Sequence, residues 1–158
     1  MNKVEIRQAN LNDLAILLEF EQSIIEYERP FEELMQTEKF NYYDLKELIL
    51  SDTAEVLVAK YDNQLVGSGY AKIKTSRHYL KDKSHAFLGF MYVSPEHRGK
   101  GINKLLIEKL IDWSKTQGMN SVSLTVFSEN KSAIKSYKKA GFKKHLVEMR
   151  LDIDQPIG

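Results

Sequence analysis

The segment HAFLGFMYVSPEHRGKGINKLL, residues 85–106, combines an apolar run, a glycine-rich turn and the start of a helical pattern. Residues 86–93, which follow His85, are all apolar, aromatic or Gly, and such a run predicts a strand buried on both faces. Ser94-Pro95 ends this strand, because Pro cannot donate to a ladder hydrogen bond. Beyond the turn, apolar residues recur at helical spacing, at Ile102, Leu105, Leu106, Leu110 and Trp113. The segment therefore predicts a strand, a turn and a helix.

The turn, residues 98–101 (RGKG), has the composition of an anion site. Amides in the first turn of a helix lack intrahelical partners, and the helix dipole adds partial positive charge there. Two glycines leave those amides accessible, while Arg98 and Lys100 add formal charge, so the turn suits a pyrophosphate. A P-loop would need Ser or Thr after Lys100, and a dinucleotide fingerprint would need a small residue at Lys104. Neither of these two motifs is present.

Two motifs resemble those of the GNAT superfamily of N-acetyltransferases. The stretch VSPEHRGKGI resembles the family's motif A, whose core is Q/R-x-x-G-x-G/A, although Glu96 stands where the family has Gln or Arg. The second landmark, N-x-x-A-x-x-x-Y-x-x-x-G-F, is matched by Asn130, Ala133, Tyr137 and Gly141-Phe142. The similarity is clearest over residues 87–142, and the N-terminal half matches only in its order of elements.

The resemblance implies acetyl-CoA as cosubstrate. In the family, the strand before motif A splays from its neighbour, and the acyl-pantetheine arm docks there. The backbones of Met91 and Val93 would then bond the pantetheine and polarise the thioester carbonyl. Core packing also explains these side chains, because the proposed contact is through the main chain. The residues expected to bind the coenzyme are Met91, Tyr92, Val93, Arg98, Gly99, Lys100, Gly101, Ile102, Asn103, Asn130, Ala133 and Tyr137.

The resemblance implies a general acid, and the chemistry of a primary amine, which is mostly protonated at neutral pH, requires a general base. Tyr137 stands where the family often has a general acid that protonates the departing thiolate; the alternative is that its ring only packs the helix on the sheet. The general base is left open. His85 is a candidate because histidine is the usual proton acceptor near neutral pH, but a strand-end histidine in solvent is an equal alternative. Glu26, Glu28 and a water relay compete with it.

Composition limits the function classes. At 158 residues, with 42% hydrophobic and 28% charged residues, the chain predicts one domain, residues 1–151, followed by a tail, residues 152–158. The absence of Cys excludes a disulfide framework and a thiolate nucleophile. The four histidines lack metal-ligand spacing, so no metal is expected. Neither a signal-like N-terminus nor a membrane-length apolar run is present, which predicts a cytoplasmic protein without membrane contact.

Charge is divided between two halves of a nearly neutral chain. Residues 19–47 carry nine acidic and three basic residues, a net of −6, whereas residues 98–150 carry twelve basic and four acidic ones, a net of +8. The basic half would face the phosphates of the coenzyme, and the acidic half favours a cationic acceptor. Solvated surface is the alternative for both. Nucleic acid is a poorer partner, because the basic segment lacks aromatic stacking spacing. The lysines expected near the phosphorylated ribose are Lys138, Lys139, Lys143 and Lys144.

The element order predicts an α/β fold of the α+β type. Strands are expected at residues 4–6, 55–61, 64–74, 85–93, 121–127 and 142–151. Helices are expected from Asn10 or Asn12 to Arg29, within residues 31–50, from Ile102 to Gly118 and from Asn130 to Ala140. By resemblance, these elements form a GNAT-like mixed, mostly antiparallel central sheet flanked by about four helices.

The sequence thus predicts an N-acetyltransferase that moves acetyl from acetyl-CoA to a primary amine of a small molecule. Direct attack in a ternary complex is favoured, because no Cys is present to form a covalent intermediate. Two alternatives stay open: a regulatory module that binds acyl-CoA without turnover, and an acetyltransferase acting on protein lysines or N-termini. A homodimer is also left open.

Overall fold

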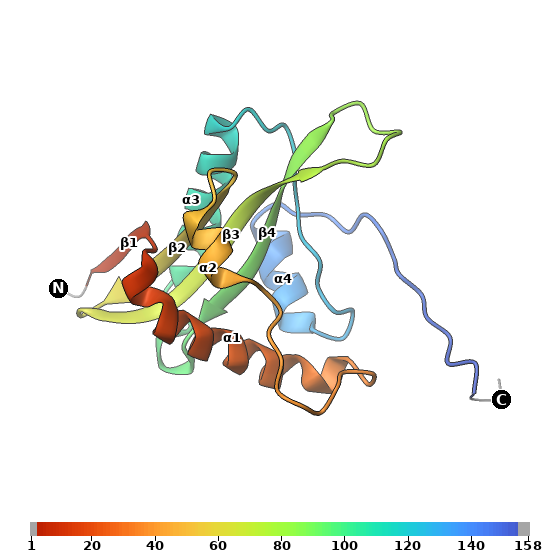
Figure 1. Ribbon diagram of the computed structural model, residues 1–158, viewed down its shortest axis with the longest axis horizontal. Helices are drawn as coiled ribbons and strands as arrows, with labels where there is room; N and C mark the ends of the chain where they lie inside the picture. Colours follow the sequence, from red (N-terminus) through yellow and green to blue (C-terminus); the bar gives the residue numbers. More distant parts are fainter. Residues whose placement is uncertain (1–2, 155–158) are drawn as a thin grey trace.

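A five-stranded sheet forms the centre of the protein (Figure 1). The structure is a computed structural model that describes residues 3–154. The strands lie in chain order, and the first four are antiparallel, while the last runs parallel to its neighbour. They are β1 (Val4–Gln8), β2 (Ala54–Tyr61), β3 (Gln64–Thr75), β4 (Ser84–Val93) and β5 (Val122–Ser123). The predicted mixed, mostly antiparallel sheet is confirmed.

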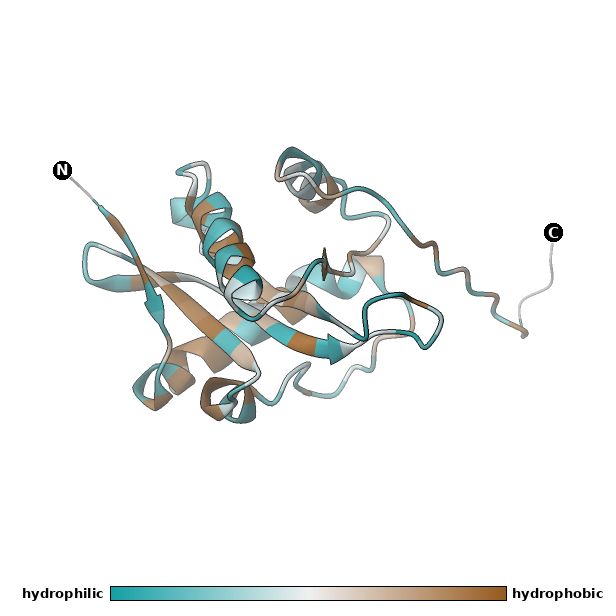
Figure 2. Cartoon of the chain, turned by 90° about the horizontal axis from the view of Figure 1, so that it is seen from above, coloured by the Kyte–Doolittle hydropathy of each residue, from teal (hydrophilic) through white to brown (hydrophobic). Residues whose placement is uncertain are grey.

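Four α-helices within residues 3–154 accompany the sheet: α1 (Leu14–Glu28), α2 (Leu45–Leu50), α3 (Ile102–Thr116) and α4 (Lys131–Lys139). Short 3₁₀ turns stand at Leu11–Asp13, Arg29–Phe31 and Pro95–His97. Figure 2 shows hydrophobic and hydrophilic residues mixed along these elements, as expected where one face is buried. About four helices were predicted, and four are observed.

Strand β2 separates two hydrophobic clusters because its side chains alternate between the faces of the sheet. Val56 and Val58 pack with Leu17 and Phe20 of α1. Their neighbours Leu57 and Ala59 join the cluster formed with α3. Helices α1 and α2 therefore cover one face, and α3 covers the other.

Strand β4 changes its alternation at Phe90. Phe90 is 1% exposed and has φ +58°, a left-handed conformation that is uncommon for a bulky residue. The β3–β4 register shifts between Ser68 and Tyr70, which marks a bulge. As a result Leu88 packs on the α3 side, whereas Phe90 packs on the α1 side. Both faces of β4 therefore pack against a hydrophobic cluster, as predicted, although only Ala86, Leu88 and Phe90 are buried and the other residues are half-buried.

Several predicted boundaries are confirmed. The β2–β3 hairpin turns through Asp62 and Asn63, which have φ +52° and +65° as a tight two-residue turn requires. Helix α1 ends at Glu28, before Pro30. Before its other end, Asn10 and Asp13 form a capping box on the 3₁₀ turn Leu11–Asp13 that leads into α1. Arg7 donates to both Asp13 oxygens at 2.8 and 2.9 Å. This contact lowers the pKa of Asp13.

The predicted helical region at residues 31–50 is largely wrong, because only α2 is helical there beyond the 3₁₀ turn. Glu21 explains the irregular path. Its carboxylate is fully buried in α1 and accepts the amides of Tyr42 and Tyr43 at 2.6 and 2.8 Å. Those amides are therefore unavailable to a helix, and the segment is held open against α1.

One predicted strand is shorter than expected, and another is absent from the described residues. The segment 121–127 forms only two residue pairs with β4, at Ala86–Val122 and Phe87–Ser123. The segment 142–151 forms no strand, and its residues after Phe142 are exposed. Both have the alternating pattern of strands, but a strand needs a neighbour to supply its backbone partners. Of the predicted tail, residues 152–154 are exposed, and residues 155–158 lie outside the described residues.

Candidate active site

The turn before α3 exposes the helix N-terminus. Gly99 and Gly101 have φ +79° and +78°, and a Cβ atom on either would meet no atom within 4 Å. Gly101 is the N-cap residue, and its carbonyl accepts the Leu105 amide at 3.2 Å. The amides of Ile102 and Asn103 precede that first helical bond. Open space therefore lies beside unpaired amides, the arrangement that an anion needs.

Arg98 and Lys100 leave this turn in different directions. The Arg98 Nε donates to the Val93 carbonyl at 3.4 Å, and its guanidinium lies 5.9 Å from the centre of the Tyr27 ring in α1. The Lys100 ammonium lies 4.2 Å from the Tyr61 ring centre in β2. Arg98 therefore lies between the end of β4 and the end of α1.

The edge of β4 next to the turn is open. Since the β4–β5 ladder ends at Phe87 and Ser123, residues 88–93 have no strand partner on that side within residues 3–154. Met91 and Val93 pack their side chains on the α3 side, and Tyr92 stacks on Phe20 with ring centres 4.5 Å apart. The side chains are thus engaged in packing, and the main chain at this edge is available to a ligand.

The second motif lies against the first. Asn130 is 6% exposed, and its Oδ1 accepts the Ala133 amide at 3.3 Å, so it caps α4 as predicted. The Asn103 side chain in α3 donates to the Ser136 hydroxyl in α4 at 3.5 Å. This contact joins the two helices that carry the motifs.

Tyr137 projects from α4 into the cluster on the α3 side, and its ring meets Phe142 edge-on at 5.9 Å. Burial, with a smaller contribution from the negative charge of Glu28, raises the pKa of Tyr137 to about 12. The phenol therefore carries its proton at neutral pH, the form required of a proton donor.

Glu28, the last residue of α1, is the carboxylate close enough to influence Tyr137. Burial raises the pKa of Glu28, and its contact with the Tyr42 hydroxyl opposes this effect. Burial first, then the charge of Glu28, raises the pKa of Tyr42 above its usual range. The sequence suggested Glu28 only as one competitor and did not suggest Tyr42. The Tyr42-Tyr43 pair within an acidic segment was the available signal.

His85 lies elsewhere. Its Nδ1 is 2.9 Å from the Ser76 hydroxyl, at the start of β4 beside the 76–83 loop. Met91 is six residues further along the strand, roughly 20 Å at the usual rise per residue. His85 therefore lies at the opposite end of β4 from the glycine turn.

Aromatic contacts place the end of α1 beside the segment that follows β5. Tyr27 meets Phe31 edge-on at 5.7 Å, and Phe31 lies 6.3 Å from Phe127. The Arg98 turn, the end of α1 and the start of α4 thus meet at one end of the β4 edge.

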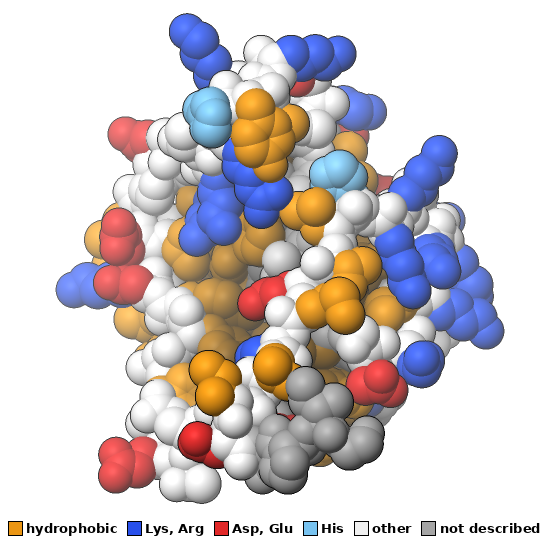
Figure 3. Space-filling view, turned by 90° about the vertical axis from the view of Figure 1, so that its right-hand side faces the viewer, with side chains coloured by type: hydrophobic (Ala, Val, Ile, Leu, Met, Phe, Trp, Pro, Cys, Tyr) orange, Lys and Arg blue, Asp and Glu red, His pale blue; other side chains and the backbone are white. Residues whose placement is uncertain are grey.

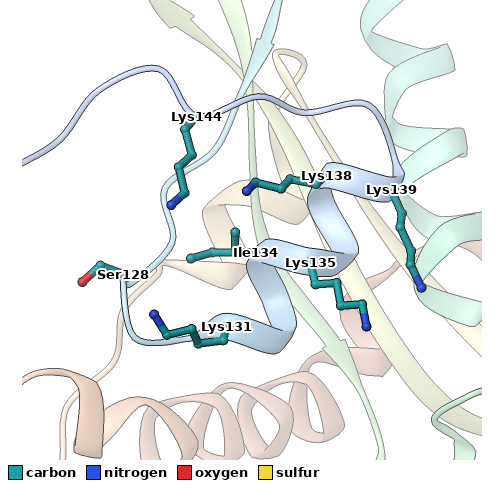
Figure 4. Close-up of a pocket in the computed structure, with 7 residues that line it drawn as sticks. All are labelled: Ser128, Lys131, Ile134, Lys135, Lys138, Lys139 and Lys144. Atoms are coloured by element: carbon teal, nitrogen blue, oxygen red, sulfur yellow. The ribbon is translucent and has the colours of Figure 1, made fainter.

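A basic surface cavity of about 500 Å³ lies on α4. Figure 4 shows Lys131, Lys138 and Lys144 around Ile134, while Lys135 and Lys139 point to the other side of the helix. The ammonium groups do not converge on one point. In Figure 3, basic side chains gather on one side of this face, next to a hollow floored by hydrophobic side chains. Such a distribution attracts anions over a distance.

Residues 3–154 contain no group of three or more His, Cys, Asp or Glu side chains that could hold a metal ion. Over the same residues, no helix has the length and apolar character to cross a membrane.

Comparison with known proteins agrees with this geometry. The sequence matches the acetyltransferase (GNAT) family over residues 18–142. It is 29% identical to a thialysine N-epsilon-acetyltransferase of Bos taurus over 152 residues, covering 87% of this chain and 83% of the bovine protein. The fold is similar to that of a mutant Bacillus halodurans protein, with a TM-score of 0.85, 16% identity and coverage of 94% and 99%.

A second solved structure is an aminoglycoside N-acetyltransferase in complex with CoA, with a TM-score of 0.72, 19% identity and coverage of 98% of this chain and 97% of that one. Since the family match spans most of the sequence and the fold agrees over nearly all of it, the chain belongs to the acetyltransferase (GNAT) family and is an acetyl-CoA-dependent N-acetyltransferase acting on an amine.

Proposed function

We propose that acetyl-CoA docks along the open edge of β4 and that a small primary amine attacks its thioester directly. The observation that carries this proposal is the β4–β5 ladder, which ends after two pairs and leaves residues 88–93 open beside the glycine turn. The pyrophosphate would bind the amides at residues 98–103, and the main chain of Met91 and Val93 would bond the pantetheine. The twelve residues expected from the sequence to bind the coenzyme stay a prediction.

Tyr137 is the proposed general acid. Attack by the amine on the thioester carbon forms a tetrahedral intermediate, and its collapse breaks the carbon–sulfur bond. The sulfur departs with the electron pair and takes the Tyr137 proton, and the nitrogen gives up its extra proton, which restores the phenol and leaves CoA thiol and the amide. The raised pKa of Tyr137 supports this role, because the phenol is protonated beforehand.

Glu28 is the proposed proton acceptor, in place of His85. A primary amine is mostly protonated at neutral pH and must lose a proton before attack. Glu28 is half-buried with a raised pKa and acts electrostatically on Tyr137, whereas His85 stands at the other end of β4. A half-buried carboxylate is also a binding group for the ammonium form of the acceptor.

The acceptor is proposed to be a small cationic amine. Thialysine and aminoglycosides, named as substrates of two similar proteins, carry more than one amino group. The acidic segment is less negative than its sequence indicates, because Arg150 from outside the segment pairs with Glu32, and Glu21 is buried with a raised pKa. Within the segment, Glu26 is already paired with Arg29. Glu28 is therefore the principal charge in this proposal.

Three further features stay proposals: one catalytic domain spanning residues 1–151, a cytoplasmic location and a homodimer. The shared sheet supports the first, since both hydrophobic clusters rest on it. Cytoplasmic location rests on the sequence prediction alone.

The test is CoA release from acetyl-CoA, followed by thiol detection, across a panel of monoamines, diamines, basic amino acids and lysine peptides. We expect amine-dependent release with small diamines or basic amino acids. Tyr137→Phe should lower kcat by about 10²–10⁴-fold with little change in CoA affinity. A loss below about threefold would assign Tyr137 to packing alone, and activity only on peptides would contradict the small-molecule proposal.

A further inference from the structure

Two lysines of β3 lie on the face of the sheet that α1 and α2 cover. Tyr70, Lys72 and Lys74 occupy alternate positions of the strand, so their side chains point to the same face. Tyr70 belongs to the hydrophobic cluster that also contains Leu17 and Phe20 of α1. Among residues 3–154, no ion pair includes either lysine. Two positive charges on this face therefore lack a counter-charge.

Both ammonium groups reach back along the sheet toward the open edge of β4. The Lys74 ammonium lies 3.9 Å from the centre of the Phe87 ring, and Phe87 is the residue of β4 that pairs with Lys72. The Lys72 ammonium lies 5.6 Å from the centre of the Tyr70 ring. That ring covers Gly89, because a Cβ atom added to Gly89 would overlap the Tyr70 hydroxyl. Gly89 belongs to the open edge of β4, so the lysines are directed to the place where the thioester is proposed to dock.

The two lysines influence each other. Burial, and then the charge of Lys72, lowers the pKa of Lys74. An anion held by both ammonium groups would offset this repulsion. Lysine binds a carboxylate through strong, charge-assisted hydrogen bonds, and the neighbouring Phe87 and Tyr70 rings fix the directions of the two side chains. The pair therefore has the chemistry of a carboxylate site.

A row of aromatic rings connects this pair with Glu28. Tyr70 meets Tyr43 edge-on with ring centres 5.4 Å apart, and Tyr43 meets Tyr42 edge-on at 5.7 Å. The Tyr42 hydroxyl is the group in contact with Glu28. In Figure 3, basic side chains also stand above the hydrophobic floor of the hollow. The two lysines and Glu28 therefore lie at opposite ends of one aromatic wall.

We propose that Lys72 and Lys74 bind a carboxylate of the acceptor, which makes the substrate an amino acid that reacts through an amine several carbon atoms away. The inference rests on the proposed function, in which Glu28 and the open edge hold the amine. Residues 87–91 of β4 span roughly 13 Å at the usual rise per residue, and the lysine side chains cover only part of that length. An α-amine, one carbon from its carboxylate, is too close, so the reacting nitrogen is the distal one.

A pair of acceptors with one amine each measures the effect of the carboxylate alone. CoA release from acetyl-CoA is compared for ε-aminocaproate and for its amide, ε-aminocaproamide, which have the same carbon chain. The acid should have a kcat/KM about tenfold higher or more, because the amide lacks the charge that the ammonium groups bind. β-Alanine should be a poorer substrate than ε-aminocaproate, because its carboxylate cannot reach the lysines while its amine is at the thioester.

Variants of the two lysines should change this preference. Lys72→Met and Lys74→Met keep the alkyl stem, and each should raise KM for the acid while kcat/KM for the amide and the affinity for CoA are unchanged. Lys72→Arg should retain the preference, and Lys72→Glu should reverse it in favour of hexamethylenediamine. Lys83→Met is the matched control, because Lys83 is an exposed lysine in the loop between β3 and β4.

Calorimetry on the enzyme saturated with CoA measures the same site without turnover. ε-Aminocaproate should bind about tenfold tighter than its amide, and the double variant Lys72→Met with Lys74→Met should remove the difference. Equal binding of acid and amide, a difference that survives the double variant, or an equal effect of Lys83→Met would overturn the proposal.

The proposed function fails in a different way. If no amine accelerates CoA release, while ε-aminocaproate still binds through Lys72 and Lys74, the transfer chemistry is wrong and the carboxylate site stands. If amines are acetylated but acid and amide react equally, the transfer chemistry stands and the carboxylate site is wrong.

Discussion

Phe90 shows how one residue shapes the site. Its positive φ reverses the side-chain alternation of β4 between Leu88 and Tyr92. Its carbonyl accepts the buried Ser68 hydroxyl at 3.0 Å, which satisfies a main-chain group that the bulge takes out of the ladder. Strained backbone of this kind persists only where the surroundings determine it. Here it lies on the open edge proposed to receive the thioester.

Glu28→Gln tests the proposed base at the same scale. The carboxyl must be ionised to accept a proton, so kcat/KM should fall as the pH drops through its pKa, which lies above the ordinary 4.5. The variant should have a kcat about 10²–10⁴-fold lower, and its kcat/KM should no longer fall as the pH drops through the pKa of Glu28. Its affinity for CoA should be unchanged. Glu26→Gln is the matched control, because Glu26 is an exposed neighbour paired with Arg29.

The free energy of unfolding of Glu28→Gln is an independent test of the same variant. A raised pKa in the folded protein means that the carboxyl stabilises the fold below its unfolded pKa and loses that contribution as the pH rises through the folded value. Glu28→Gln should therefore be at least as stable as the natural protein at neutral pH. If it unfolds more easily there, lost activity would reflect structure rather than catalysis.

At the scale of elements, the turn and α3 act together as the proposed pyrophosphate site. Gly101→Leu should lower CoA affinity about 100-fold or more, which corresponds to about 2.8 kcal/mol, because its side chain would fill the open space beside the helix amides. The left-handed conformation adds a cost of about 1–2 kcal/mol in stability. Isothermal calorimetry and urea unfolding measure the two effects.

Gly118 offers a matched control at the opposite end of the same helix. It has φ +79°, and a Cβ atom there would also meet nothing within 4 Å. Gly118→Leu should therefore carry a similar stability cost with unchanged CoA affinity. Equal affinities in the two variants would show that the coenzyme binds elsewhere.

At the scale of the whole molecule, lysines line the cavity on α4, whereas Glu28 places a carboxylate at the end of α1. Figure 3 shows the basic side chains gathered on one part of this face. Fields of this extent raise encounter rates of oppositely charged ligands by about 10–10³-fold and weaken with ionic strength. The anionic coenzyme would thus be attracted to the lysines, and a cationic amine would be attracted to the carboxylate.

We therefore expect kcat/KM for a diamine to exceed that for a matched neutral-tailed monoamine by about tenfold at low salt. The ratio should shrink as salt rises past about 0.15 M, where the Debye length is about 8 Å. The comparison is made at saturating acetyl-CoA, so that weaker coenzyme binding does not contribute. Equal rates, or one salt dependence for both amines, would contradict a cationic acceptor.

The sequence by itself determined the elements whose signals are local. The β4–turn–α3 unit, the hairpin at Asp62-Asn63 and the cap at Asn130 all depend on residues near one another in the chain. Backbone conformation at Gly, Pro and Asn follows from their own covalent chemistry, so these boundaries could be predicted. The two GNAT motifs share this property, and they identified the family.

Tertiary structure alone decided the rest. The Glu28 contact with Tyr42, the Phe90 bulge and the Ser76–His85 contact depend on residues that only the folded chain brings together. Residues 121–127 likewise form only the two-residue strand β5, and residues 142–151 form no strand, although the alternation is present in both segments. A strand is completed by hydrogen bonds from a neighbour, and no local pattern states whether that neighbour exists or which copy of the chain supplies it.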